Sequence, residues 1–208
     1  MRDDYLTLPD WLDVSRETFT KLAAFQALVE KWNPAINLIS KSRISELWDR
    51  HILDSAQLIR FCPPGTISWC DLGSGGGFPG LVISILAQDR FPDLTVTLVE
   101  SDRRKAVFLG QAIRELALNA VVEAKRIDDL PNLNSQVVSA RALASLTDLL
   151  PWVQRHLCRD GVAIFPKGAN AQQEVIDARK NWSFDIEEFS SFTSIESRIL
   201  VLKDISHA

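Results

Sequence analysis

The chain has 208 residues, of which 46% are hydrophobic and 24% charged, and these values suit one α/β domain with a small appended element. Its formal net charge of −4 at pH 7 argues against a protein that coats nucleic acid nonspecifically, because such proteins are usually basic. A site for a structured RNA would therefore need a local basic face.

The three cysteines are scattered along the chain, and they form neither a CxxC pair nor a Cys/His cluster. Neither a disulfide framework nor a metal site is therefore expected. No apolar run approaches the roughly 18 residues of a membrane-spanning helix, and the first residues carry no apolar leader. We expect a cytoplasmic protein that does not bind a membrane.

The N-terminal part predicts helices. Residues 1–14 read as a loosely ordered lead-in, and Ser15 offers a cap for the helix that follows. Apolar side chains then recur at a helical period as far as Trp32. The pair Asn33-Pro34 predicts the end of this helix, since the residue before a proline resists the α region.

A second amphipathic helix is expected over residues 44–60, and Pro63-Pro64-Gly65 is typical of a hinge. We therefore divide the chain into a helical extension, residues 1–62, and a cofactor-binding domain, residues 63–208.

The segment Asp71–Gly80 reads Asp-Leu-Gly-Ser-Gly-Gly-Gly-Phe-Pro-Gly and lies between two apolar runs. This is the strand, glycine-rich turn and helix that open a nucleotide-binding sheet. Glycines at 73, 75 and 77 let the backbone turn sharply and approach a ligand that a Cβ would push away. With Glu100 at the end of the next strand, the spacing fits both the dinucleotide fingerprint and the S-adenosylmethionine (SAM) pattern.

The remainder alternates strand and helix, which predicts a parallel sheet covered on both faces. The expected strands span residues 67–70, 95–100, 121–126, 136–140 and 161–165, and the expected helices span 102–116 and 146–157. Two extended runs, 184–191 and 198–203, follow with too few residues between them for a crossover helix, so they should pair antiparallel. A seven-stranded, mostly parallel sheet closed by such a hairpin is the Rossmann-like fold of class I SAM methyltransferases. A dehydrogenase would continue to alternate.

The chain resembles the RsmG (GidB) family of bacterial 16S ribosomal RNA methyltransferases. The residues that carry the resemblance are Lys31-Trp-Asn with Asn37-Leu38, Arg50-His-Ile-Leu-Asp-Ser55, Asp71–Gly80, Ser139-Ala-Arg-Ala142 and Pro166-Lys-Gly168. They span nearly the whole chain, and the Arg-His-x-x-Asp-Ser block is far more specific than a glycine loop. The resemblance implies transfer of a methyl group from SAM to N7 of a guanine, position 527, within 16S rRNA.

The resemblance also implies a set of cofactor-binding residues. They are Gly73, Gly75, Gly77, Phe78, Glu100, Ile127, Asp128 and Arg141. Glu100 takes the place of the acid that binds the ribose hydroxyls. The pair Ile127-Asp128 departs from the Glu-containing pair common in the family, and because Asp is one methylene shorter, we expect a main-chain contact to the adenine there.

Guanine N7 carries a lone pair in the ring plane, so its methylation requires no prior removal of a proton. Arg141 and Lys167 each follow the carboxyl end of an expected strand, where ligands bind in open α/β sheets. We predict that one of them orients the base and the other a phosphate, and we name both as catalytic candidates. Three further candidates, Arg50, His51 and Arg126, together with Lys167, are predicted to contact RNA.

Structural explanations remain open for these residues. Arg50 and Asp54 lie four apart on one helix face and are spaced to pair with each other. The tryptophans at 32, 48, 69 and 152 lie in apolar settings and are expected in the core.

The alternative functions are a SAM enzyme acting on a small molecule or a protein, an NAD-dependent oxidoreductase, and a noncatalytic ribosome-associated protein. The RNA substrate could be naked 16S rRNA, the 30S subunit or its precursor.

Overall fold

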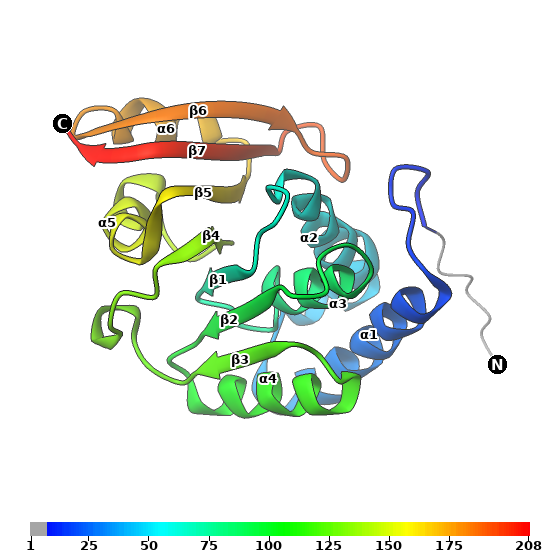
Figure 1. Cartoon of the computed structure of the whole chain (residues 1–208). Coiled ribbons are helices and arrows are strands. Elements are labelled where there is room, and N and C mark those ends of the chain that lie inside the picture. The colour runs from blue at the N-terminus through cyan, green and yellow to red at the C-terminus, as the bar shows by residue number, and fades with distance from the viewer. Residues whose placement is uncertain (1–7) are drawn as a thin grey trace.

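A computed structural model describes residues 8–208, and its centre is a seven-stranded sheet in the order β3-β2-β1-β4-β5-β7-β6 (Figure 1). The strands are β1 Ser68–Leu72, β2 Thr95–Val99, β3 Ala120–Glu123, β4 Ser135–Ala140, β5 Leu157–Lys167, β6 Trp182–Ser190 and β7 Arg198–His207. The first five strands pair parallel, whereas β7 lies antiparallel between β5 and β6. The predicted sheet with its C-terminal antiparallel hairpin is confirmed.

Helices cover both faces of the sheet. The longer ones are α1 Arg16–Ile36, α3 Gly80–Arg90, α4 Arg103–Leu116, α5 Leu146–His156 and α6 Ala171–Ala178. α1, α3 and α4 lie on one face, and α5 and α6 lie on the other (Figure 1). Neighbouring residues of β1 alternate between the two hydrophobic cores, since Trp69 packs in the first and Cys70 in the second.

The first helix begins where the sequence predicts and ends later. The Ser15 hydroxyl accepts a hydrogen bond from the Thr18 N–H, which is the expected cap. The predicted end at Asn33-Pro34 is wrong, because α1 runs through Pro34 to Ile36. Asn37, with a φ of 49°, closes the last turn by donating its N–H to the Asn33 carbonyl. A proline so near the end of a helix removes one backbone donor without preventing one further turn.

The second expected helix is a continuous helical segment, residues 41–61, whose hydrogen-bond pattern changes along its length. It contains 3-10 turns at Lys41–Glu46 and Gln57–Phe61, a π-helical stretch at Trp48–Leu53, and a single α turn, α2, at Asp54–Ala56. The π-helical stretch changes which main-chain carbonyls are paired within the helix.

Further differences concern the lengths of strands, with β7 reaching His207 rather than residue 203, and a missed element. The third strand ends at Glu123 rather than residue 126, and β5 begins at Leu157 rather than residue 161. Helix α6 was not anticipated, because its polar run Gln-Gln-Glu carries little helical periodicity. It packs against α5 and covers the second core beside β5 and β7.

Part of the predicted lead-in, residues 1–7, lies outside the described residues. The described remainder is packed, since Leu12 is buried and Trp11 stacks on Phe192 at a ring-centroid distance of 5.0 Å. The division of the chain at residue 62 stays a prediction, because the helical segment 41–61 and one face of the sheet share a single hydrophobic core.

None of the helices within residues 8–208 is long and apolar enough to span a membrane. Across the same residues, no three His, Cys, Asp or Glu side chains gather in a geometry that could hold a metal ion.

Candidate cofactor and substrate site

A pocket of about 460 Å³ opens at the carboxyl ends of β1, β2 and β4, where the parallel strands deliver their following loops to one edge of the sheet. Seven of the eight predicted cofactor residues line it: Gly73, Gly75, Phe78, Glu100, Ile127, Asp128 and Arg141. The eighth, Gly77, is not among the lining residues. A Cβ at Gly77 would lie 2.5 Å from Leu81 Cδ1, so this glycine is required for packing.

The glycine loop is held by hydrogen bonds beneath the pocket. Asp71 is fully buried and accepts from the Ser139 hydroxyl at 2.7 Å and from the Gly80 N–H at 3.1 Å. The Ser139 oxygen in turn accepts from the indole N–H of Trp69 at 2.8 Å. Burial raises the pKa of Asp71 to about 6. The role of Asp71 is therefore to anchor the loop, and it does not line the pocket.

Glu100 forms the side of the pocket that faces the loop. Its carboxylate accepts one hydrogen bond from the Gly75 N–H at 2.8 Å and another from the Asp102 N–H at 2.7 Å. The side chain is buried, and these two donors fix its orientation. A carboxylate has about four acceptor positions, so capacity remains for the two hydroxyls of a ribose.

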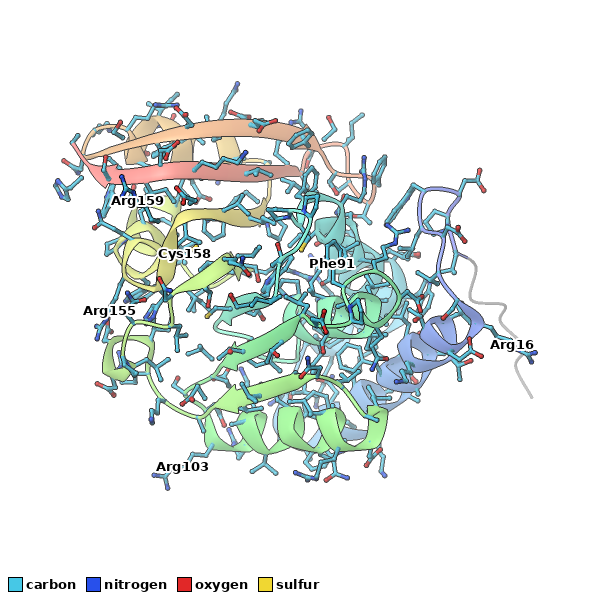
Figure 2. All side chains as sticks on the ribbon, viewed as in Figure 1. Arg16, Phe91, Arg103, Arg155, Cys158 and Arg159 are labelled. Atoms are coloured by element: carbon cyan, nitrogen blue, oxygen red, sulfur yellow. The ribbon has the colours of Figure 1, made fainter. Side chains whose placement is uncertain are left out.

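The opposite wall comes from the short turn Ile127–Asp129 after β3. The Asp128 carboxylate accepts from the indole N–H of Trp152 at 2.6 Å, and the Asp128 carbonyl accepts from the Arg155 guanidinium at 2.9 Å. Arg155, which belongs to the last turn of α5 and is labelled in Figure 2, also donates to the Leu130 carbonyl at 2.6 Å. The side chain of Asp128 is thus already engaged, which is consistent with a main-chain contact to a ligand here.

Trp152 corrects one expectation. It is half-buried against the second core, and it also lines the pocket, which was not expected. The other three tryptophans are closer to what the sequence predicts, since Trp48 and Trp69 are buried and Trp32 is half-buried against the first core.

Arg141 connects β4 to the helical segment 41–61. Its guanidinium donates to the Arg50 carbonyl at 3.2 Å, to the His51 carbonyl at 3.4 Å and to the Ser55 hydroxyl at 3.4 Å. Asp54 lies 3.6 Å from the same group. The π-helical stretch thus offers main-chain carbonyls to an arginine from a distant strand.

His51 also contacts Arg141 through its imidazole. The guanidinium donates to His51 Nδ1, which places the ring proton on Nε2, and Nε2 is buried with no hydrogen-bond partner among residues 8–208. Burial, followed by the charge of Arg141, lowers the pKa of His51 to about 4. The ring is therefore neutral at physiological pH, and it packs on Phe78 at a centroid distance of 5.1 Å.

The loop after Arg141 adopts an unusual backbone conformation. Ala142 has a φ of 51°, in the left-handed region that a residue with a Cβ rarely occupies. Leu143 follows and packs over Gly73, where a Cβ would lie 2.7 Å from Leu143 Cδ1. Gly73 itself has a φ of 68°, so both its conformation and its neighbour require glycine.

Lys167 lies outside this first pocket. It lines a second pocket of about 270 Å³, together with Glu174 and Arg198, and Arg141 and Ala142 line both pockets. The Lys167 ammonium donates to the Ala144 carbonyl at 3.0 Å and to Glu174 Oε2 at 2.8 Å.

The remaining RNA-binding candidates lie at the rims. Arg126 is exposed at the mouth of the first pocket, beside Lys105 and Lys125. Arg50 pairs with Glu46 at 2.8 Å and not with Asp54, and it lines a third hollow with Arg43 and His51. A chain with a net charge of −4 thus gathers basic side chains around its pockets. Arg103, by contrast, projects away from the body of the protein (Figure 2).

Sequence reasoning missed several residues that shape the site, namely Asp54, Ser55, Leu143, Trp152, Arg155 and Glu174. Four of them lie inside segments already noted, Arg50–Ser55 and the helix after β4, so closer reading of those segments could have found them. Nothing in the sequence indicates the position of Glu174, because its helix was not predicted.

The model of the GidB family, described as rRNA small subunit methyltransferase G, matches residues 18–201. The chain belongs to this family. A ribosomal RNA small subunit methyltransferase G from Ruegeria sp. (strain TM1040) is 49% identical over 194 residues, covering 93% of this chain and 94% of that protein.

A second relative with the same name, from Cereibacter sphaeroides (strain ATCC 17029), is 50% identical over 196 residues, covering 94% of this chain and 95% of its own length. Among solved structures, a SAM-dependent methyltransferase from Aquifex aeolicus aligns with a TM-score of 0.57 at 11% identity, covering 85% of this chain and 96% of that one. M. jannaschii TYW2 in complex with AdoMet aligns with a TM-score of 0.53 at 12% identity, covering 82% and 78%. At such identities these structures establish the fold alone.

Proposed function

We propose that this protein transfers the methyl group of SAM to N7 of a guanine, position 527, in 16S rRNA. The observation that carries the proposal is the pocket at the carboxyl edge of the sheet in a member of the GidB family. There, the glycine loop and the fixed carboxylate of Glu100 meet.

The residues that line the first pocket suit the parts of this cofactor. Glu100 would accept hydrogen bonds from the ribose hydroxyls, and the main chain at Ile127 and Asp128 would contact the adenine edge. Gly73 and Gly75 give bare backbone at the centre, and Phe78 and Arg141 complete the wall. Gly77 supports the loop from beneath and is proposed to act only through packing.

SAM held by Glu100 and the glycine loop would supply a methyl group activated by its sulfonium, and the lone pair of guanine N7 would be the nucleophile that takes it, with S-adenosylhomocysteine as the other product. Guanine N7 carries no proton, so the protein needs no general base for this step. Its residues instead align N7 with the methyl carbon and the sulfur, and they surround the reacting atoms with fixed polar groups. Proximity and orientation of this kind contribute on the order of 7–11 kcal/mol to such reactions.

Arg141 and Lys167 are proposed to have different roles in positioning the substrate. Four hydrogen bonds tie the Arg141 guanidinium to the helical segment, so we infer that it fixes the wall between the two pockets. Lys167, in the second pocket, is the residue that we assign to the base. Donation from lysine to guanine O6 is a common pairing, and it leaves N7 free.

The basic rims support an RNA substrate. Arg126 lies at the mouth of the first pocket, and Arg50 with Arg43 lines the hollow beside His51. Side chains in such places contact phosphates and fix the register of the substrate. We propose that Arg126, Arg50 and His51 contact the RNA, and that the substrate is 16S rRNA within the 30S subunit or its precursor.

The test is methyl transfer by the purified protein from radiolabelled SAM to 30S subunits, naked 16S rRNA and a protein extract. We expect label in the RNA of the 30S sample, recovered as 7-methylguanosine after nuclease digestion. Label confined to the protein extract, or a different modified nucleoside, would contradict the proposal. Equal labelling of naked rRNA would remove the requirement for an assembled subunit.

A further inference from the structure

The second pocket adjoins the first, and a different set of residues lines it. It lies between the loop after β4, the end of β5, helix α6 and the start of β7. Its volume of about 270 Å³ gives room for a flat purine base, and it meets the first pocket at Arg141 and Ala142. A base placed here would lie beside the cofactor site.

Two charged side chains face this pocket as a fixed pair. Lys167 Nζ and Glu174 Oε2 are 2.8 Å apart, and the two side chains are 9% and 25% exposed. Each is also tied to the loop before α5, because Lys167 donates to the Ala144 carbonyl and Glu174 Oε2 accepts from the Leu146 N–H at 2.7 Å. These three hydrogen bonds hold both side chains in place.

Both members of the pair retain unused hydrogen-bonding capacity. An ammonium has three N–H donors, and Lys167 uses two of them. Glu174 accepts both of its bonds at Oε2, and no donor within residues 8–208 reaches Oε1. This pair therefore presents one donor immediately beside one acceptor.

This order matches guanine and opposes adenine. Along its pairing edge, guanine has the acceptor O6 next to the donor N1–H, whereas adenine has the donor N6–H₂ next to the acceptor N1. We propose that Lys167 and Glu174 together read the target base, with Lys167 donating to O6 and Glu174 Oε1 accepting from N1–H. N7 lies on the neighbouring edge of the ring and stays free for methylation.

The inference rests on the proposed function, and it adds Glu174 as a specificity-determining residue. A site built to bond a particular polar edge rejects analogues strongly, because a mismatched base leaves the buried donor and acceptor unpaired. The competing explanation is that Glu174 only holds the loop that contains Arg141 and Ala142. The two explanations differ in whether Glu174 senses the proton on guanine N1.

The test is a double-mutant cycle in which one change is made in the enzyme, at Glu174, and the other in the substrate, at guanine N1. Small-subunit rRNA is assembled by ligation with either guanosine or 1-methylguanosine at the target position, and kcat/KM for methyl transfer is measured on each. The N1-methyl group removes the donor that Glu174 accepts and keeps both O6 and N7. Wild type, Glu174→Ala, Glu174→Gln and Asp177→Ala are compared, and Asp177 is the matched control because it lies on the same helix in an ion pair with Lys180.

We expect wild type and Asp177→Ala to prefer guanosine by at least ~100-fold, and Glu174→Ala to prefer it by less than ~5-fold. Glu174→Gln keeps the shape of the side chain, but Leu146 and Lys167 would take its single acceptor oxygen, so it should lose the preference as well. If circular dichroism shows that the alanine variant is unfolded, the glutamine variant decides the question. A Glu174 variant that folds and keeps the wild-type ratio would overturn the inference, whereas a wild type that makes no 7-methylguanosine on the guanosine substrate would overturn the proposed function instead.

Discussion

Arg141, at the end of β4, donates hydrogen bonds to both the main-chain carbonyl and the imidazole of His51, 90 residues earlier in the chain. The contact joins the N-terminal helical segment to the edge of the sheet where the pockets lie. It also explains why the π-helical stretch is placed there, since the arginine satisfies its carbonyl groups. The wall of the cofactor pocket therefore depends on two distant parts of the chain.

Replacement of Arg141 should affect stability and activity together. Arg141→Ala takes one donor from two main-chain carbonyls and from Asp54, whose Oδ1 still accepts from Gln57 and Thr193, so we expect the free energy of unfolding to fall by ~1–3 kcal/mol. Methyl transfer should fall by at least ~100-fold, because the wall between the pockets is no longer fixed. Chemical denaturation and single-turnover assays measure the two effects, and a variant with wild-type stability and near-normal turnover would remove Arg141 from the site.

His51 should contribute more stability near neutral pH than in acid. Its folded pKa of about 4 lies below the ordinary 6.5, so the unfolded chain takes up a proton at a higher pH than the folded one. The stabilisation is therefore complete above pH ~6.5 and is lost as the pH falls towards 4.

His51→Asn keeps an acceptor near the position of Nδ1 and cannot titrate, which makes it the matched variant. We expect the difference in unfolding free energy between wild type and this variant to shrink as the pH falls through that window. A difference that stays constant between pH 7 and pH 4.5 would show that His51 is not held in its neutral form.

Asp71, in contrast to His51, should stabilise the folded protein more in acid than near neutral pH. Burial raises its pKa from 3.8 to about 6, so the folded protein holds the proton to a higher pH than the unfolded chain does. Its contribution is fully present below pH ~3.8 and is lost as the pH rises through 6, by a total of about 3 kcal/mol. Comparing wild type with Asp71→Asn by urea denaturation from pH 4 to pH 7.5 isolates this effect, and a pH-independent difference would mean that Asp71 is ionised throughout.

Glu100 should matter chiefly for cofactor affinity. Glu100→Ala removes the carboxylate fixed by Gly75 and Asp102, and we expect S-adenosylhomocysteine to bind ~10–100-fold more weakly by calorimetry. Glu123→Ala is the control, because Glu123 ends the neighbouring strand and forms an ion pair with exposed Lys125. NADH should bind neither protein. Unchanged affinity in Glu100→Ala would place the cofactor elsewhere.

The sheet and the first pocket could be predicted because their signals are local. A glycine loop between two apolar runs and an acid at the end of the next strand fix which residues meet at the carboxyl edge. The hairpin could be predicted from the short connection between its strands. The residue types and their order along the chain carried this information.

The partners of the basic residues could not be predicted in this way. The sequence spacing suggested an ion pair between Arg50 and Asp54. In the structure Asp54 instead pairs with Arg141, which is distant in the sequence, and Arg50 pairs with Glu46. Lys167 was predicted from its place after a strand, whereas Glu174 depends on a helix that lacks a clear apolar period. Side-chain pairing across elements is set by packing, which local patterns do not encode.

The most direct measurement is the methylation state of 16S rRNA in a strain that lacks this protein. The rRNA fragment that contains position 527 is digested and its nucleosides are separated by mass spectrometry. We expect the fragment to lack 7-methylguanosine, and we expect a plasmid carrying the wild-type gene to restore it while Glu100→Ala does not. A fragment that still carries the full amount of 7-methylguanosine in the absence of this protein would contradict the proposed function.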